Sequence, residues 1–326
     1  MLSLAGSIPS SADRFEYTQI HMGLPVRIVL HAADELAAQR AAGAAFERIA
    51  ALDRSMSDRR PDSDVRRLAE HAGTPVPVCP DVMTVVARAI EIARTTGGAF
   101  DPTVGPLVSL WREARRSGRL PAPTVLARAR SHVGWQQIEL DPAASTIRLR
   151  HPGMALDLGG IAKGYILQEA LRTLRLHGVT RALIESGGDI VVGDAPPGRA
   201  GWAVWTTGAG AQFAERASRL TNAALASSGP STQFAEIEGK RYSHIIDPRT
   251  GLGVTSRRVA RVIADDAATA DALATALTVL EPGSVPALLD GFPGVIVSVA
   301  LAEDDSRQPA NSGDAGNPDN FPGRIF

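Results

Sequence analysis

The fold of this chain is organised around the stretch Met154-Ala155-Leu156-Asp157-Leu158-Gly159-Gly160-Ile161-Ala162-Lys163-Gly164-Tyr165. A short apolar run ends at an aspartate, two glycines follow, and a helical pattern begins behind them. We therefore predict a strand, a tight glycine turn and a helix N-terminus. Glycines let the backbone come close to a ligand, and the first turn of a helix offers free N–H groups to an anion.

Asp157 and Lys163 bracket this turn with one charge of each sign. A lysine beside glycines at a helix start suits a phosphate, whereas an aspartate and open carbonyls suit a hard cation or a polar ring. The spacing is neither that of a Walker phosphate loop nor that of a dinucleotide fingerprint. An ordinary tight connection with a surface lysine explains the stretch equally well.

Length and composition indicate an ordinary globular protein. The 326 residues are 44% hydrophobic and 21% charged, which allows one large domain or two intimately packed halves. The net charge of -1 argues against a nucleic-acid partner. The single cysteine, Cys79, excludes an internal disulfide and a cysteine-based zinc site.

The sequence contains no transmembrane segment, because no run approaches the ~20 apolar residues that a membrane helix needs. Residues 1–8 have no basic region and no sustained apolar core, so they do not resemble a signal peptide. As written, the chain is expected to be cytoplasmic. The alternative is a periplasmic or membrane-anchored protein whose N-terminal leader is missing from this sequence.

The first 100 residues predict strands followed by helices. Residues 15–30 alternate apolar and polar side chains, which predicts two strands around Met22-Gly23. Asp34 is expected to cap a helix that runs to about Arg54. The polar segment 56–65 is typical of a solvated loop. The core contacts expected from the first helix are Leu36, Phe46, Ile49 and Leu52.

A second helix is predicted from Pro80 or Asp81 to Gly97-Gly98, and residues 99–106 are too rich in glycine and proline for a regular element. The central region then predicts short helices at 108–117 and 123–131, a hairpin at 138–150, and a helix behind Lys163 to about His177.

The C-terminal half is predicted to be mostly strands. Gly187-Gly188 separates two of them and is either a bare-backbone ligand site or a simple hairpin turn. The last strong helix spans 267–280, where Asp271 and Thr275 share one face. Further strands are expected at 181–184, 190–192, 202–206, 223–227, 234–238, 241–246, 259–264 and 295–301.

Three segments follow from this pattern. Residues 1–14 form an N-terminal extension, 15–301 form one compact domain, and 302–326 form a disordered C-terminal tail that is almost free of apolar residues up to Asn320.

Several of these motifs, in this order, resemble the ApbE family of FAD:protein FMN transferases. They span about residues 17–300. The matching pieces are Met22-Gly23, Met56-Ser57 with Ser63-Asp64-Val65, Thr96 to Thr103, Asp157 to Tyr165, Ser186-Gly187-Gly188-Asp189, His244 to Gly251, and Ala270 to Leu277.

The resemblance implies an α+β fold of the ApbE type, which is T-fold-like and mixed α/β. Its sheets would be antiparallel, with an FAD cleft between two intimately packed halves. It also implies magnesium-dependent transfer of FMN from FAD to a threonine or serine hydroxyl of an acceptor flavoprotein, with release of AMP. Two alternatives remain open, namely a metal-dependent FAD pyrophosphatase that yields FMN and AMP, and a flavin-binding protein without turnover.

The resemblance also implies roles for single residues. The catalytic residues are expected to be His244, Lys163 and Asp271, with His244 as general base for the acceptor hydroxyl or as a lining residue of the FAD site. Mg²⁺ is expected at the Gly160 carbonyl and the Asp271 and Thr275 side chains. The residues expected to contact FAD are Met22, Arg59, Ala99, Phe100, Asp101, Asp157, Lys163, Gly187, Gly188, His244 and Ile245.

Two positions depart from the family pattern. Arg59 stands near the place where relatives often have a tyrosine, although a guanidinium can also stack on a ring. Asp189 stands where asparagine is common. Without the resemblance, Asp271 is equally well explained as an ordinary early-helix acid and His244 as a structural histidine.

Overall fold

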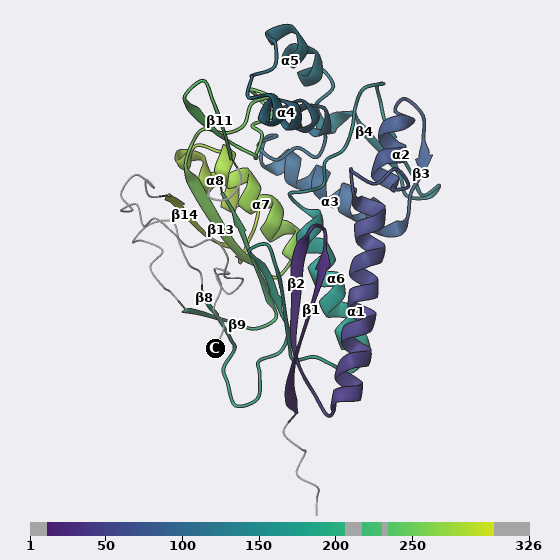
Figure 1. Cartoon of the computed structure of the whole chain (residues 1–326), viewed down its shortest axis with the longest axis vertical. Coiled ribbons are helices and arrows are strands. Elements are labelled where there is room, and N and C mark those ends of the chain that lie inside the picture. The colour runs from purple at the N-terminus through teal and green to yellow at the C-terminus, as the bar shows by residue number, and fades with distance from the viewer. Residues whose placement is uncertain (1–11, 206–216, 230–233, 303–326) are drawn as a thin grey trace, which may run out of the picture.

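A seven-stranded antiparallel sheet forms the centre of the described structure (Figure 1). In the computed structural model, this structure comprises residues 12–205, 217–229 and 234–302. The strand order is β1-β2-β6-β7-β10-β13-β14, and every neighbouring pair is antiparallel. The strands are β1 Asp13–His21, β2 Leu24–Ala32, β6 Ala182–Ser186, β7 Asp189–Val192, β10 Ala223–Ser228, β13 Arg258–Ala264 and β14 Ile296–Leu301.

Helices pack against one face of this sheet. The long helix α1 lies beside α6, and α6 lies beside α7, which packs in turn on β10 and β13. Their apolar side chains form the main core of the protein. The helices are α1 Glu35–Met56, α2 Asp64–Glu70, α3 Pro80–Thr95, α4 Gly105–Ser117, α5 Pro123–Arg130, α6 Ala162–Leu176, α7 Ala267–Val279 and α8 Val285–Leu289.

The opposite face of the sheet carries a smaller apolar cluster. Val29, Leu183 and Val192 of the sheet pack there with Trp202 and Val204. Trp202 and Val204 lie on β8 Trp202–Trp205, which pairs with β9 Ala217–Leu220 in a separate two-stranded sheet. A three-stranded sheet of β3 Val76–Pro77, β5 Thr146–Leu149 and β4 Ile138–Asp141 lies near α2.

A third apolar cluster joins α4 and α5 to a separate hairpin, β11 Phe234–Ile237 with β12 Lys240–Ser243. Its centre is the pair Trp111 and Tyr242, whose rings meet edge to face with centroids 5.3 Å apart. Aromatic pairs of this geometry add stability beyond the area they bury. The cluster therefore attaches the segment that follows β12 to the helices at one end of the molecule (Figure 1).

The structure corrects four sequence predictions. Leu36 is 60% exposed instead of buried, because it lies on the face of α1 opposite the buried stripe that begins at Ala38. Residues 154–158 form no strand, and Ala155 makes only an isolated bridge to Val104. The segment 56–65 is not a loop throughout, because α2 begins at Asp64 with Ser63 as its cap, and Asp64 is buried. Strands β3 and β9 and helix α8 were not predicted.

The remaining helices and strands are confirmed, with ends that differ by a few residues. Asp34 caps α1 by accepting a hydrogen bond from the Ala37 N–H, as its position predicted. The predicted C-terminal tail falls almost entirely outside the described residues, and the division into an extension, a domain and a tail stays a prediction.

The irregular loop before α4 is braced by buried side chains. Asp101 Oδ1 accepts hydrogen bonds from the backbone N–H of Thr103 at 2.8 Å and from its hydroxyl at 2.6 Å. Asp101 Oδ2 accepts from the Trp135 N–H at 3.1 Å, and the Thr103 hydroxyl accepts from the Gly134 N–H at 2.7 Å. These bonds fix residues 99–104 in place although the loop has no regular structure.

Gly164 allows α6 and α7 to approach closely. A Cβ at this position would lie 2.1 Å from the Ala267 carbonyl oxygen, which belongs to the first turn of α7. Backbone cannot move aside as the end of a side chain can. We therefore expect Gly164→Ala to lower the free energy of unfolding by about 1–3 kcal/mol, through overpacking, in urea denaturation experiments.

Gly43 is the matched control, because it lies inside α1 and a Cβ there would meet nothing within 4 Å. Gly43→Ala should raise the free energy of unfolding by about 0.5–1 kcal/mol, since alanine has the higher helix propensity. Two substitutions with effects of the same sign would contradict this account of the α6–α7 contact.

The Asp101 brace predicts a second stability effect. Asp101→Ala leaves the Thr103 and Trp135 N–H groups without their acceptor inside the protein, so the free energy of unfolding should fall by about 2–4 kcal/mol. The same urea titration measures it. Asp62→Ala removes an exposed carboxylate that contacts Arg60 and should leave the transition in place; equal effects of the two substitutions would argue against the brace.

Candidate functional site

Lys163 lies at the start of α6, directly after the Gly159-Gly160 turn. Asp157 Oδ1 accepts a hydrogen bond from the Gly159 N–H at 2.8 Å, which closes the turn. The Asp157 N–H donates to the Pro102 carbonyl at 2.8 Å, so the turn is also tied to the loop before α4. The first residues of α6 are thereby held in a defined position.

The Lys163 ammonium lies between two buried carboxylates. Nζ contacts Asp189 Oδ2, and it lies 3.1 Å from Asp271 Oδ1. The side chains of Asp189 and Asp271 are only 3% and 6% exposed, whereas that of Lys163 is 24% exposed. The three residues come from β7, α7 and α6, which are far apart in sequence. We call them the Lys163 cluster.

Backbone groups hold both carboxylates of this cluster. Asp189 Oδ1 accepts a hydrogen bond from the Ser227 N–H of β10 at 3.2 Å. Asp271 Oδ2 accepts one from the Gly164 N–H at 3.2 Å, at the N-terminus of α6 where such donors have no helical partner. Each carboxylate therefore has one ionic and one neutral partner, as buried charges require.

The pKa values of the cluster reflect this balance. Burial lowers the pKa of Lys163, but the two carboxylates outweigh it, so the pKa is raised and the side chain is an ammonium. Burial raises the pKa of Asp189 to about 7; the Lys163 charge opposes this rise and the Asp271 charge adds to it. When both carboxyl groups are ionised, the two carboxylates and one ammonium carry a formal charge of -1, which favours an additional cation.

The three residues expected to bind Mg²⁺ lie close together. Asp271 and Thr275 are one turn apart on α7, and a Cβ on Gly160 would lie 3.0 Å from Thr275 Oγ1. Among the described residues, no group of three histidine, cysteine or acidic side chains could hold a metal. A carboxylate, a hydroxyl and a carbonyl are nevertheless the oxygen ligands that Mg²⁺ takes, so the residues fit this ion.

The expected FAD-contact residues around Asp157 form a second group. A Cβ on Gly160 would lie 3.4 Å from the Phe100 ring, which places Phe100 beside one of the expected metal ligands. Burial raises the pKa of Asp157, Asp58 raises it further, and the charges of Arg112 and Arg59 lower it. Arg112 also pairs with Asp58 at 2.6 Å and links α4 to the loop after α1.

The two hairpin tips of the sheet lie next to each other. Gly187 and Gly188 form the β6–β7 turn with positive φ angles of 58° and 92°, so a hairpin turn is present, and contact of its backbone with a ligand stays a prediction. A Cβ on Gly187 would lie 2.7 Å from Leu24 Cδ1, beside Met22 at the tip of the β1–β2 hairpin. The Met22 N–H donates to Asp53 Oδ2 at 3.2 Å.

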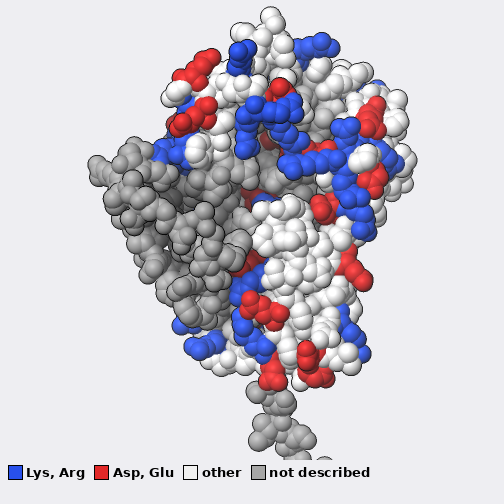
Figure 2. All heavy atoms as spheres, viewed as in Figure 1, with Lys and Arg blue, Asp and Glu red and all other residues white. Residues whose placement is uncertain are grey.

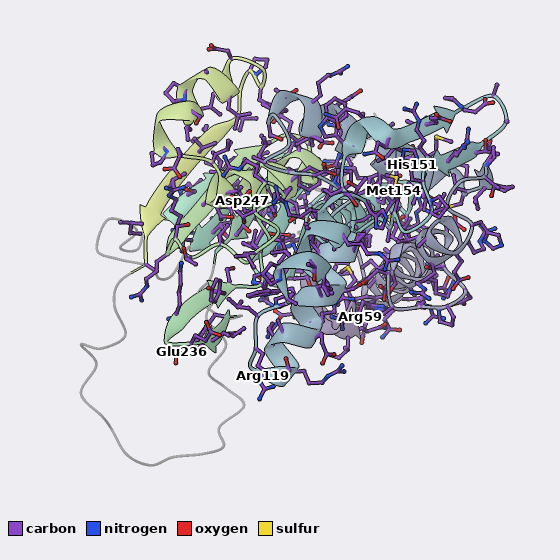
Figure 3. The ribbon with its side chains drawn as sticks, turned by 90° about the horizontal axis from the view of Figure 1, so that it is seen from above. Arg59, Arg119, His151, Met154, Glu236 and Asp247 are labelled. Carbon is purple, nitrogen blue, oxygen red and sulfur yellow. The ribbon has the colours of Figure 1, made fainter. Side chains whose placement is uncertain are left out.

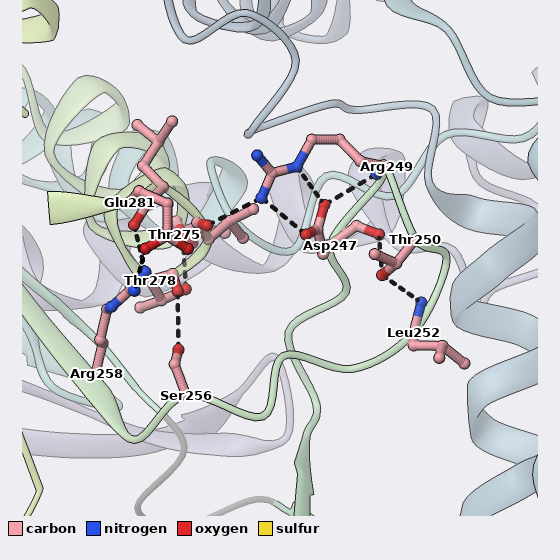
Figure 4. A network of polar contacts seen from close by, with 11 residues as sticks. Asp247, Arg249, Thr250, Leu252, Ser256, Arg258, Thr275, Thr278 and Glu281 are labelled. Carbon is pink, nitrogen blue, oxygen red and sulfur yellow. Dashed lines mark hydrogen bonds and ion pairs between the residues drawn. The ribbon is translucent and has the colours of Figure 1, made fainter. Parts of the chain in front are cut away.

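The segment after β12 is anchored to the C-terminus of α7 (Figure 4). His244 is exposed and Ile245 is buried in the main core. Asp247 and Arg249 form a two-bond ion pair, and Arg249 donates to the Val279 carbonyl at 3.2 Å. An arginine at this helix end suits the helix dipole. The turn that carries His244 is thus connected to the helix that carries Asp271 and Thr275.

The molecule is hollowed between the β1–β2 hairpin tip and α4, and Lys and Arg side chains gather along the α4 side (Figure 2). The exposed arginines of α4 and of the residues directly after it are Arg112, Arg115, Arg116 and Arg119. Arg59 follows α1 and Arg119 follows α4, and the view from above places both toward one edge (Figure 3).

An open pocket of about 520 Å³ lies beside the Asp101 brace, and Asp101 and Trp135 are part of its wall. Its walls are Gly97, Gly98, Asp101, Ala127, Arg130, Ser131, Val133, Trp135, Gln136, Pro248 and Arg249.

Two contributors to the site were missed by sequence reasoning. Asp189 was noted only as a departure from a pattern, and Arg112 was not singled out. Asp189 reaches Lys163 across 26 positions of sequence, and Arg112 reaches Asp58 across 54. No periodicity connects such positions, so only the folded chain reveals these pairs.

Among the described residues, no helix is both long and apolar enough to cross a membrane.

Comparison with known proteins agrees with this architecture. The profile of the ApbE family matches residues 22–298. The FAD:protein FMN transferase of Treponema pallidum is 34% identical over 257 residues, which are 74% of this chain and 71% of that protein. The protein of the same name from Chlamydia trachomatis is 30% identical over 276 residues, 82% of this chain and 85% of its own.

Solved structures agree as well. The flavinyl transferase ApbE of Pseudomonas stutzeri superposes with a TM-score of 0.79 at 26% identity, covering 90% of this chain and 92% of that one. The flavin transferase ApbE of Vibrio cholerae gives a TM-score of 0.78 at 28% identity and covers 90% and 95% of the two chains. The predicted α+β fold with antiparallel sheets is confirmed. With most of its length matched by the family profile and by these relatives, the chain belongs to the ApbE family.

Proposed function

We propose that this protein transfers FMN from FAD to a serine or threonine hydroxyl of an acceptor flavoprotein and releases AMP. The observation that carries the proposal is the Lys163 cluster, in which a partly exposed ammonium and two buried carboxylates lie beside Gly160 and Thr275. A cation and a hard-metal ligand set at one helix N-terminus suit a pyrophosphate. The relatives named above are called FAD:protein FMN transferases.

In this reaction the acceptor oxygen attacks the phosphorus of the FMN half of FAD. The new P–O bond forms as the bond from that phosphorus to the bridging oxygen breaks, and AMP leaves with the bridging oxygen. Such transfers depend on an in-line nucleophile and on neutralised phosphate charge. Bound to Asp271, Thr275 and the Gly160 carbonyl, Mg²⁺ would supply most of that neutralisation. The Lys163 ammonium supplies a second positive charge.

Other residues of the site position FAD and the acceptor. Asp157 and the loop 99–101 hold the flavin and adenosine portions, with Met22, Arg59 and the Gly187-Gly188 turn as further contacts. His244 takes the proton of the acceptor hydroxyl, because an exposed imidazole can accept a proton near neutral pH. Ile245 lines the same region. The cytoplasmic location that the sequence indicates stays a prediction.

The decisive experiment incubates the protein with FAD and Mg²⁺, with and without a candidate acceptor that bears a serine or threonine target. Intact mass and AMP release are measured together. An acceptor that gains one FMN while AMP appears supports the transferase. Release of FMN and AMP with every acceptor unlabelled would replace it by a metal-dependent FAD pyrophosphatase. FAD that binds and stays unchanged would indicate a flavin-binding protein.

Asp271→Ala should abolish Mg²⁺-dependent turnover, with a loss of about a hundredfold or more in kcat, because it removes the only carboxylate of the proposed metal ligands. The AMP assay across a Mg²⁺ titration measures it. Asp265→Ala changes an exposed acid just before the same helix and should behave like the parent. Unchanged turnover in Asp271→Ala would remove this residue from the metal site.

Lys163→Ala should lower kcat/KM for FAD by about ten- to a hundredfold, which corresponds to the loss of one charge-assisted hydrogen bond. Lys240 is the other lysine of the chain; it lies over the Tyr242 ring on β12, and Lys240→Ala is the matched control. Steady-state kinetics at saturating Mg²⁺ compares them. Equal kinetics for Lys163→Ala and the parent would place Lys163 outside the site.

A further inference from the structure

Asp271 already has partners for both of its oxygens in this structure. Oδ1 lies 3.1 Å from Lys163 Nζ, and Oδ2 accepts from the Gly164 N–H. A metal ion that binds Asp271 therefore meets an ammonium on the same carboxylate. The two cations repel each other, so Mg²⁺ and Lys163 compete for Asp271 unless the ammonium has another anion to hold it.

Asp189 is that other anion. It is 2% exposed, its Oδ2 contacts Lys163, and its Oδ1 is fixed by the Ser227 N–H of the neighbouring strand β10. Because β7 and β10 are inner strands of the central sheet, Asp189 is attached to strands that have a hydrogen-bonded neighbour on each side.

We propose that Asp189 is a positioning residue that retains the Lys163 ammonium beside the site when Mg²⁺ takes Asp271. With Asp189 present, the ammonium needs only to loosen one of its two contacts. Without it, Asp271 is the remaining partner of Lys163 within the cluster, and the ammonium opposes metal binding directly. The inference deepens the proposed function, on which it rests, and gives Asp189 a role that acts through Lys163.

The first test measures the Kd of Mg²⁺ alone by isothermal titration calorimetry on the full chain, without turnover. Asp189→Asn keeps the side-chain shape and an acceptor for the Ser227 N–H but removes the charge. We expect its Kd to rise about tenfold, as substitutions of groups that orient metal ligands do. Asp189→Glu retains the charge and should stay within about threefold of the parent.

Asp64→Asn is the matched control for the loss of a buried charge. Asp64 also has one basic partner, Arg67, and one backbone donor, the Cys79 N–H at 2.8 Å. It lies on α2 and makes none of the contacts of the Lys163 cluster. The control should leave the Kd of Mg²⁺ unchanged, and a Kd raised equally in both variants would overturn the proposal.

A double-mutant cycle tests whether Asp189 acts through Lys163. Lys163→Met removes the competing ammonium, so Asp189→Asn should change the Kd of Mg²⁺ by less than about twofold in that background. A tenfold effect in both backgrounds would mean that Asp189 acts on the metal directly, and it would overturn the positioning role.

The chain has only two lysines, so NMR with ¹⁵N-labelled lysine observes Lys163 next to a single reference signal, Lys240. On addition of Mg²⁺ to the parent protein, the Lys163 ammonium signal should shift and stay distinct from that of exposed Lys240. In Asp189→Asn it should move toward the Lys240 signal. Merging of the two signals in the parent would overturn the proposal even where a variant does not fold.

The outcomes separate this inference from the proposed function. A parent protein that labels an acceptor while Asp189→Asn binds Mg²⁺ as tightly as the parent leaves the transferase intact and overturns the role of Asp189. A parent protein that binds no Mg²⁺ overturns the metal ligand set and the role of Asp189 together.

Discussion

The close approach of α6 and α7 is the constraint on which the site depends. At Gly164 the two backbones are so near that a single added carbon would collide with the Ala267 carbonyl. This approach lets the Gly164 N–H reach the Asp271 carboxylate and brings Lys163 within 3.1 Å of it. The residue types of both helices have a function only at this separation. Gly164 therefore allows the two helices to pack closely and also supplies a hydrogen bond to Asp271.

The net charge of the protein is close to zero, but charged side chains gather at particular places in the structure. Its net charge is -1, yet the Lys163 cluster buries two carboxylates against one ammonium, and Lys and Arg side chains gather along the α4 side of the hollow between α4 and the β1–β2 hairpin (Figure 2). Buried charges are stable only with partners, which here come from strands β7 and β10 and from the N-terminus of α6. A dianionic pyrophosphate and a divalent cation together would meet complementary charges there.

The sequence predicted most of the helices and strands because their signals are local. Asp34 as a helix cap, the two N-terminal strands and the helix of Asp271 and Thr275 each follow from spacing within a few residues. The errors came from the same source. Leu36 has the residue type of a core contact but lies on the face of α1 opposite the buried stripe. Residues 154–158 have the composition of a strand but pair only through the Ala155–Val104 bridge.

For the candidate site, the sequence alone determined the residue types, their order and the family they resemble, because each motif and each pair of turn glycines is a short run of neighbouring residues. It placed Asp271 and Thr275 on one helix face and Lys163 at a helix start. Only the tertiary structure decided that Asp189 pairs with Lys163, that Arg112 joins Asp58 beside Asp157, and that Arg249 ties the His244 turn to α7. These contacts join elements separated by tens of residues, and their energies depend on burial that no single segment possesses.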